Sequence, residues 1–313
     1  MARYLFDTNE IFFPVDLCKL YWESPDKRDM FGNLQTVCED FNAVVDLERD
    51  YVFATVTREY VLIPNREAAE LGFDLLAHLF HLLDDGRCYA AAYWTTSKRS
   101  ECEIDIVLDY EAALPLADEG WRPMVKVVNS YNKKRKLTFY LGFCRVDGEG
   151  CSEGAFLISG LTLELNSTHN ASAAALRGIL FDRVDANPDM DVKRIARALE
   201  AKMERLKSIS LTRSNMLSLC GKIFGFSTSK ADGEPSDARE KAAALIKARV
   251  PMKKGRGDAY AFFVAMMAYA STSEKFTRRA QTTKSELQLG AWLDSFVQAV
   301  SKPNFQLRKY LAS

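Results

Sequence analysis

The sequence predicts an α+β fold, in which a mainly antiparallel sheet with a packed helix precedes an all-helical C-terminal part. Two observations predict it. Between residues 51 and 165, short segments rich in β-branched and aromatic residues alternate with turns, whereas beyond residue 188 apolar residues recur with the helical period. Strands that come first and helices that come last argue against a doubly wound sheet. We therefore expect an α+β domain over 1–187 and a helical region over 188–313.

The first part of the chain supplies the predicted strands. Residues 1–50 show no clear period, so we expect short helices and loops there. In 137–146, Leu137, Phe139, Leu141 and Phe143 alternate with other residues, which places Phe139 and Phe143 on a core-facing side. By the same criteria, strands are predicted at 51–63, 88–96, 103–109, 124–131, 137–146 and 155–165.

Helices are predicted from apolar residues spaced three or four apart and from capping residues. One helix, 66–83, falls among the strands, with Asn65 as its expected N-cap. Asp237 and Glu240 resemble a capping box, and Asp258 is expected to cap another helix. The C-terminal helices are predicted at 191–207, 214–226, 237–249, 259–271 and 283–301, with a loop at 227–237.

Cysteine usage and hydropathy indicate a compartment. The seven cysteines are scattered and include no CxxC pair, which favours free thiols in a reducing environment. The start of the chain carries Asp7 and Glu10 and lacks the apolar run of a secretory signal. The longest apolar stretch, 259–270, is shorter than the roughly 20 residues of a membrane span. We expect a cytoplasmic protein without a membrane partner.

The charge is divided unequally along a chain whose net charge is zero. Residues 1–120 hold 10 basic and 24 acidic residues, whereas 121–313 hold 32 basic and 18 acidic ones. Such asymmetry is typical of a basic part that binds a polyanion. The alternative is that the two parts neutralise each other in the folded protein.

The most basic turn lies between two predicted strands. From 121 to 146 there are seven Lys and Arg and no acid, and Lys133, Lys134, Arg135 and Lys136 are consecutive. These residues and Arg145 are candidate phosphate contacts. Tyr131 and Tyr140 in the same hairpin are candidates for stacking on the bases of single-stranded nucleic acid. The alternative is a charged hairpin tip that only faces water.

A second basic loop, KKGRGD at 253–258, precedes the helix expected at 259. Lys253, Lys254 and Arg256 are candidate phosphate contacts, because glycine-rich backbone before a helix N-terminus favours anions. The loop does not match the phosphate-binding pattern GxxxxGK[ST]. A solvated loop with a capping Asp258 is the alternative interpretation.

Patterns of enzymatic chemistry are weak. Glu101, Glu103, Asp105 and Asp109 offer carboxylates from which a metal-dependent nuclease could be assembled. The simpler interpretation is that Glu103 and Asp105 form the outward face of an alternating strand. No GxSxG or HExxH pattern occurs. The spacing of His78 and His81 on a predicted helix could hold a metal, but no third ligand is evident nearby, and His169 lacks a recognisable ligand spacing. No cofactor or metal is predicted.

Two segments carry a resemblance to a known family. They are REYVLIPNREAAELG (58–72) and VVNSYNKKRKLTFYLGFCRVDGEGCSEGAFL (127–157). Over about residues 50–165 they resemble a phage- and plasmid-encoded family of unknown function, in which an Asn-Ser-His/Tyr-Asp-Gly turn precedes an Arg-Val/Leu-x-Cys-x-Asn-Gly element. Here Lys133 replaces the glycine of the turn, Glu153 replaces the asparagine, and extra residues separate Arg145 from Cys151.

The resemblance implies a phage or mobile-element origin. Such elements mostly encode replication, recombination and counter-defence functions, which makes a nucleic-acid partner an expectation. The leading hypothesis is a non-enzymatic protein that binds single-stranded DNA or RNA in replication or recombination. The alternatives are a protein-binding module, either an inhibitor of host defence or a self-assembling homo-oligomer, and a metal-dependent nuclease.

Overall fold

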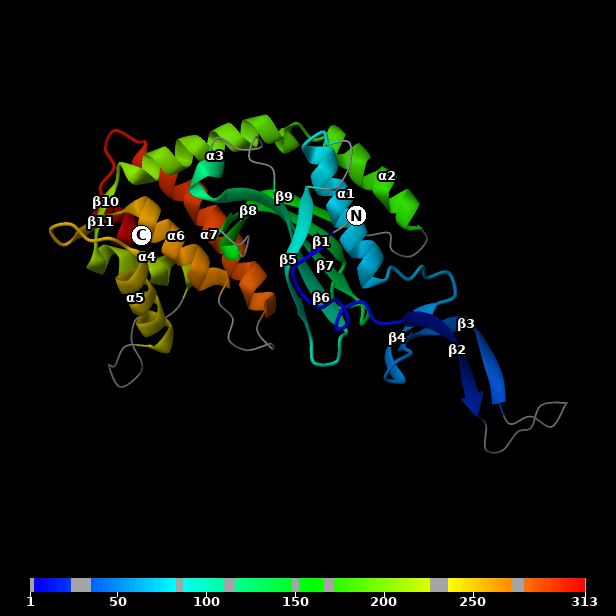
Figure 1. Cartoon of the computed structure of the whole chain (residues 1–313). Helices are drawn as coiled ribbons and strands as arrows, with labels where there is room; N and C mark the ends of the chain where they lie inside the picture. The colour runs from blue at the N-terminus through cyan, green and yellow to red at the C-terminus, as the bar shows by residue number, and fades with distance from the viewer. Residues whose placement is uncertain are drawn as a thin grey trace. The chain divides into compact units, whose positions relative to one another are not determined.

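The computed structural model describes residues 3–23, 35–82, 87–109, 116–147, 152–165, 172–225, 236–271 and 279–312. Within these ranges the fold is α+β, as predicted, with mostly antiparallel strands and a helical C-terminal part (Figure 1). No helix in the described ranges is both long enough and apolar enough to cross a membrane.

Six strands form the largest sheet, in the order β1-β5-β6-β7-β8-β9. Because β5 to β9 follow one another both in the chain and in the sheet, short connections suffice between most neighbours. The two-residue β1 pairs in parallel with β5. The bounds are β1 Arg3–Tyr4, β5 Cys88–Thr95, β6 Glu101–Leu108, β7 Trp121–Ser130, β8 Leu137–Val146 and β9 Ser152–Leu165. The five strands predicted between 88 and 165 are thus confirmed.

A separate three-stranded sheet, β2-β3-β4, corrects the expectation for residues 1–50. Its strands are β2 Val15–Glu23, β3 Gln35–Asp46 and β4 Tyr51–Thr57. Lys19 pairs with Asn42 but Leu20 pairs with Cys38, so β3 bulges at this point. The bulge breaks the period-2 alternation, which is why no strand was predicted here.

Helices cover the remaining segments. Among the described residues they are α1 Asn65–Leu79, α2 Ala173–Asp185, α3 Val192–Lys207, α4 Arg213–Phe224, α5 Asp237–Arg249, α6 Ala259–Ser271, α7 Arg279–Val300 and α8 Leu307–Ala312. Asp258 caps α6, as predicted, by accepting from the backbone N–H of Ala261. Asn65 and Asp237 are not N-caps but first helical residues, behind Pro64 and Ser236. Most of the loop expected at 227–237 lies outside the described residues.

The chain divides into two compact units, each built from separate segments. Unit 1 comprises 1–106, 125–139 and 163–187, and unit 2 comprises 107–124, 140–162 and 188–313. The break at 187/188 coincides with the expected domain boundary, but parts of the predicted N-terminal domain belong to unit 2.

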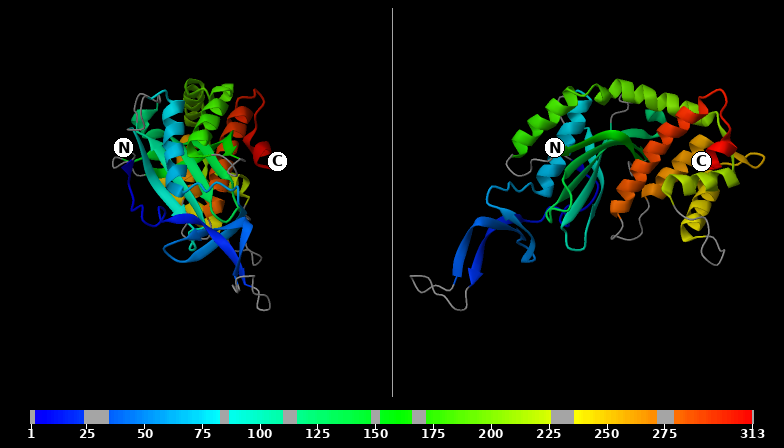
Figure 2. Two further views of the ribbon diagram at one scale, coloured as in Figure 1. Left: turned by 90° about the vertical axis from the view of Figure 1, so that its right-hand side faces the viewer. Right: turned by 180° about the vertical axis from the view of Figure 1, so that it is seen from behind.

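Each unit has its own core. In unit 1, α1 and α2 lie side by side (Figures 1 and 2), and Gly72 of α1 comes so close to Ile106 and Val127 that a Cβ would overlap both side chains. In unit 2, α6 contacts α3, α5 and α7, and its buried Phe262 and Phe263 join a core that includes Trp121. The apolar stretch 259–270 is therefore a buried helix.

Candidate nucleic-acid interface

The basic residues between 121 and 146 are mostly neutralised by acids. Two of the pairs, Lys126–Asp105 and Arg135–Glu103, join β7 and the following turn to β6, the neighbour of β7 in the sheet. Opposite charges on neighbouring strands stabilise a sheet through such cross-strand pairs. The ion pairs are Arg122–Asp109 at 3.5 Å, Lys126–Asp105 at 2.8 Å, Arg135–Glu103, Lys136–Glu164 at 3.2 Å and Arg145–Glu153 at 3.7 Å.

Two of these pairs are buried. The side chains of Lys126 and Glu103 are fully inaccessible, and that of Asp105 is 10% exposed. A buried charge that loses its partner destabilises a protein strongly. These pairs therefore serve the fold, and Arg135, a predicted phosphate contact, is held by Glu103.

The turn between β7 and β8 has acidic partners for two of its four consecutive cations, Arg135 and Lys136. Lys133 adopts a left-handed conformation with φ of 60°, and its Nζ donates to the carbonyl oxygen of Thr55 at 2.7 Å. Lys134 is exposed and forms no ion pair with any described residue. Of the four consecutive basic residues, Lys133 and Lys134 thus form no ion pair in the described ranges, and the ammonium group of Lys133 is held by a backbone carbonyl oxygen.

The aromatic residues of the hairpin differ from expectation. Tyr131 is 2% exposed, its ring stacks on Phe53 with 5.4 Å between centroids, and its Oη accepts from the backbone N–H of Asn65 at 2.7 Å. Burial also raises the pKa of the Tyr131 phenol. The ring is therefore part of a core and is not placed to stack on a base. Tyr140 is half-buried on β8.

Arg145 has a structural role inside unit 2. Its guanidinium donates from Nε and Nη2 to the carbonyl oxygen of Glu119, at 3.1 and 3.0 Å, and it pairs with Glu153. Phe139 and Phe143 are buried, as predicted from the alternation of β8. The structure therefore brings the predicted residues 131–145 together as a framework and not as an open basic face.

The second predicted site has the opposite character. The two-stranded sheet of β10 Ser210–Thr212 and β11 Arg256–Asp258 extends into a tight turn, in which Lys253 and Arg256 exchange backbone hydrogen bonds of 2.7 and 3.0 Å. Lys254 and Gly255 between them have φ of 50° and 75°, the conformation of a type I′ turn. The turn holds Lys253, Lys254 and Arg256 on an exposed tip.

Three further basic residues lie beside this tip. Lys247 and Arg249 form the last turn of α5, and Arg213 begins α4 directly after Thr212, the residue that pairs with Arg256. Gly257 packs against Val250 so closely that a Cβ would lie 2.7 Å from its side chain, which joins the turn to the end of α5. We call the set the α5–β11 basic surface; it comprises Arg213, Lys247, Arg249, Lys253, Lys254 and Arg256.

The α5–β11 basic surface is not neutralised. All six side chains are exposed, and none of them forms an ion pair with a residue in the described part of the chain. Arg213 is held by a hydrogen bond to the carbonyl oxygen of Ala243, which leaves its charge uncompensated. Six uncompensated cations gathered around the end of α5 and the turn before β11 attract a polyanion and release its counterions on binding.

Sequence reasoning missed half of this surface. Lys253, Lys254 and Arg256 were predicted, whereas Arg213, Lys247 and Arg249 were not. A signal was present, because 241–257 holds six basic residues and no acid, a higher density than 121–146. The expected anion position at the N-terminus of α6 is already occupied by the Asp258 carboxylate, 2.6 Å from the Ala261 nitrogen.

The acidic residues considered for a nuclease are engaged elsewhere. Glu103 and Asp105 pair with Arg135 and Lys126, and Asp109 pairs with Arg122. In the described ranges no three His, Cys, Asp or Glu side chains are grouped so that they could hold a metal ion. This arrangement gives no support to metal-dependent hydrolysis.

Comparison of the chain with protein-family models, with curated proteins and with solved structures gave no match. In the segment that carries the family resemblance, Asn129 is buried and its amide donates to Asn65 of α1 and to the carbonyl oxygen of Ile63. Glu153 pairs with Arg145, and Cys151 lies outside the described residues. The described residues of this motif thus connect strands and helix within their units.

Proposed function

We propose that the protein binds nucleic acid without enzymatic activity, through phosphate contacts made by the α5–β11 basic surface. The observation that carries the proposal is that these six exposed cations lack carboxylate partners in the described chain. Phosphate contacts of Lys and Arg provide affinity that is independent of sequence and strongly dependent on salt.

The mode of binding follows from what surrounds the surface. Base stacking on Tyr131 has no support, because its ring is buried. The half-buried Tyr140 also lies on β8, away in sequence from the α5–β11 residues. We therefore propose contact with the backbone and leave the choice among single-stranded DNA, single-stranded RNA and duplex to measurement. The resemblance of residues 50–165 supports a role in replication or recombination of a phage or mobile element, in the cytoplasm of its host.

The proposal is tested by fluorescence anisotropy with labelled single-stranded DNA, single-stranded RNA and duplex DNA over a salt series. Neutralising three residues, as Lys253→Gln/Lys254→Gln/Arg256→Gln, is expected to weaken binding about 100-fold at 0.1 M salt. The slope of log affinity against log salt is expected to fall by about 2 to 3, because three phosphate contacts are lost. Unchanged affinity and slope would exclude this surface.

A matched variant separates these contacts from net charge. Lys136→Gln/Arg177→Gln/Arg194→Gln removes the same charge from residues that are ion-paired with Glu164, Asp74 and Asp189. Since paired cations contribute little free potential, this variant is expected to bind within about threefold of the wild type. Equal losses in the two variants would mean that binding follows net charge alone.

A second candidate function is supported by β2 and β3. Tyr21 and Trp22 are 57% and 60% exposed, and Val37 and Phe41 on β3 are also exposed. Tyr21 and Val37 are paired directly across the two strands, and adjacent exposed apolar side chains of this kind are typical of protein-interaction sites. Capture of a protein partner from nuclease-treated host lysate, or concentration-dependent self-association by light scattering, is expected to be lost in Tyr21→Ser/Trp22→Ser. No capture and no self-association would remove this candidate.

A further inference from the structure

Unit 2 contains a pocket that the proposed function does not use. Its volume is about 260 Å³, and its walls are β9, α3 and α7. Gly290 brings α7 so close to β9 that a Cβ would lie 1.9 Å from the carbonyl oxygen of Leu157, which closes one side. All lining residues belong to unit 2, so the pocket forms within one compact unit.

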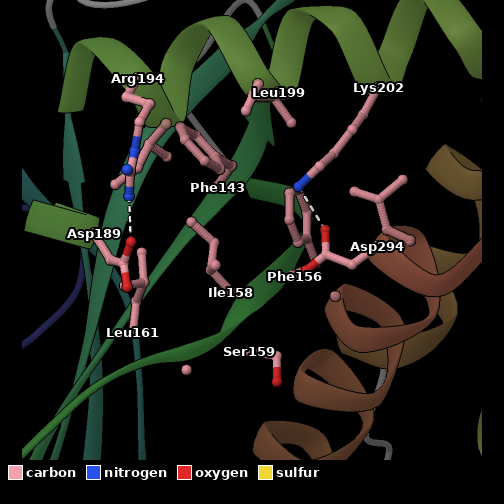
Figure 3. A pocket seen from close by; sticks show the side chains of 15 residues that line it. Phe143, Phe156, Ile158, Ser159, Leu161, Asp189, Arg194, Leu199, Lys202 and Asp294 are labelled. Carbon is pink, nitrogen blue, oxygen red and sulfur yellow. Dashed lines mark hydrogen bonds and ion pairs between the residues drawn. The ribbon is translucent and has the colours of Figure 1, made fainter. Parts of the chain in front are cut away.

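The pocket has an apolar body. Phe143, Phe156, Ile158 and Leu161 come from the sheet, whereas Leu199 faces them from α3 (Figure 3). None of these side chains offers a hydrogen bond. A ligand that fills this part gains affinity by burying apolar surface.

An ion pair stands at each end of the apolar body. Figure 3 shows Arg194 with Asp189 at one end and Lys202 with Asp294 at the other. Arg194 and Lys202 are eight residues apart on α3, which corresponds to roughly 12 Å along the helix. The apolar part is therefore elongated and bounded by charge.

The end at Lys202 opens onto a groove that carries several polar side chains. This groove shares Ser159, Lys202 and Asp294 with the pocket and adds Ser295 and Gln298 of α7. Lys202, Ser159 and Gln298 can donate hydrogen bonds to a head group that emerges from the pocket. An elongated apolar body next to a group of donors matches an amphiphile.

The sign of the head group follows from the Lys202–Asp294 pair. The Asp294 side chain is 43% exposed and that of Lys202 is 30% exposed. Asp294 can therefore move into water at lower cost than Lys202, and Lys202 is left to bind an incoming anion. We propose that this pocket binds a small amphiphilic carboxylate, with a chain of about eight to ten carbons along the roughly 12 Å between the ion pairs.

Calorimetric titration with hexanoate, octanoate and decanoate tests the proposal. Affinity is expected to rise about fourfold for each added methylene, because each buries further apolar surface. Decanoate is expected to bind at one site and more tightly than decylamine, which carries the opposite charge. Absence of saturable decanoate binding, or tighter binding of decylamine, would overturn the proposal.

Two pairs of variants locate the site. Ala198 and Ala201 are both exposed on α3, but only Ala198 lines the pocket. Ala198→Phe is expected to abolish decanoate binding, whereas Ala201→Phe keeps it. Lys202→Met is expected to lower the affinity for decanoate about tenfold and to leave the affinity for decanol unchanged. Asp294→Asn is expected to raise the affinity for decanoate. Binding that survives Ala198→Phe, or a Lys202→Met effect that is equal for acid and alcohol, would contradict the assignment.

Discussion

Neither of the two basic segments, 121–146 and 241–257, contains an acidic residue. They differ in the groups that surround their basic side chains in the folded protein. In the first, strands β6 and β9 and the segment around Glu119 supply carboxylates and carbonyl oxygens to most of the cations. In the second, the end of α5 and the turn at 253–256 before β11 expose their cations to solvent.

The difference shows that a local charge run does not indicate whether the charge is available. A strand inside a sheet has neighbours on both sides, and those neighbours can be acidic although they are distant in sequence. A two-residue turn joined to a helix end has few such neighbours. Whether the charges of a basic run can bind a partner therefore depends on the position of its helix, strand or turn in the fold.

The largest effect is expected where a cation is buried. Lys126→Met removes the buried ammonium group that pairs with Asp105 and is expected to lower the free energy of unfolding by about 3–5 kcal/mol. Urea denaturation measures it. Lys126→Met/Asp105→Leu is expected to recover most of the loss, and the exposed Lys253→Met to stay within about 0.5 kcal/mol. Equal losses of unfolding free energy in Lys126→Met and Lys253→Met would contradict the distinction between a structural and an exposed basic segment.

A smaller loss is expected at Tyr131. Tyr131→Phe removes the oxygen that accepts from the Asn65 N–H, so a buried donor loses its partner at a cost of about 1–3 kcal/mol. Denaturation curves of Tyr131→Phe and of the half-buried Tyr140→Phe give the comparison. Nucleic-acid affinity of Tyr131→Leu, measured on folded protein, is expected to match the wild type. A large loss of affinity there would restore the stacking hypothesis.

The turn between β7 and β8 gives a direct counterpart to the turn at 253–256 before β11. Lys133→Gln/Lys134→Gln/Lys136→Gln removes three charges, but Lys136 is paired with Glu164 and the ammonium group of Lys133 is held by the Thr55 carbonyl oxygen. Its affinity for nucleic acid is expected to fall less than that of the Lys253, Lys254 and Arg256 variant, because at most two phosphate contacts are lost. A fall as large as that of the Lys253, Lys254 and Arg256 variant, in the same anisotropy assay, would make the two turns equivalent.

The smallest effect concerns pH and Glu119. Burial raises the pKa of this carboxyl, but hydrogen bonds from Lys207 and Tyr260 outweigh burial and lower it below its ordinary value of 4.5. Since the folded pKa is below the unfolded one, the stabilisation is present above about pH 4.5 and is lost as pH falls through the folded pKa.

The Glu119 side chain is 34% exposed, so the effect is expected to stay below about 1 kcal/mol. Thermal unfolding of wild type and Glu119→Gln at pH 7 and pH 3.5 measures it. The difference between the two proteins is expected to shrink at the lower pH, and a difference that grows would contradict the sign.

The sequence predicted elements whose signal is local. The alternation of Leu137, Phe139, Leu141 and Phe143 defined β8 with its observed bounds, and Asp258 was identified as the cap of α6. β3 was not predicted, because its bulge interrupts the alternation of apolar and polar residues. α2 was not predicted, although its buried residues Leu176, Leu180 and Val184 recur every four positions.

The candidate site was predicted only in part, for a physical reason. Lys253, Lys254 and Arg256 could be identified from the run itself, but the pairing of Arg135 with Glu103 depends on which strands become neighbours. The burial of Tyr131 depends on Phe53, which lies on the predicted strand 51–63, and on Phe13, which lies in the segment 1–50 whose structure was not predicted. Long-range contacts of this kind leave no periodic signal in the chain.

The interleaving of the two units has a consequence for synthesis of the chain. Unit 1 needs residues up to 187, whereas unit 2 takes Trp121, Phe143 and Phe156 of its core from segments that lie before that point. During translation neither unit can complete its core from one continuous stretch, so the native contacts close over long sequence separations and form slowly. A fragment starting at residue 188 lacks those aromatic side chains, and we expect that it does not fold alone.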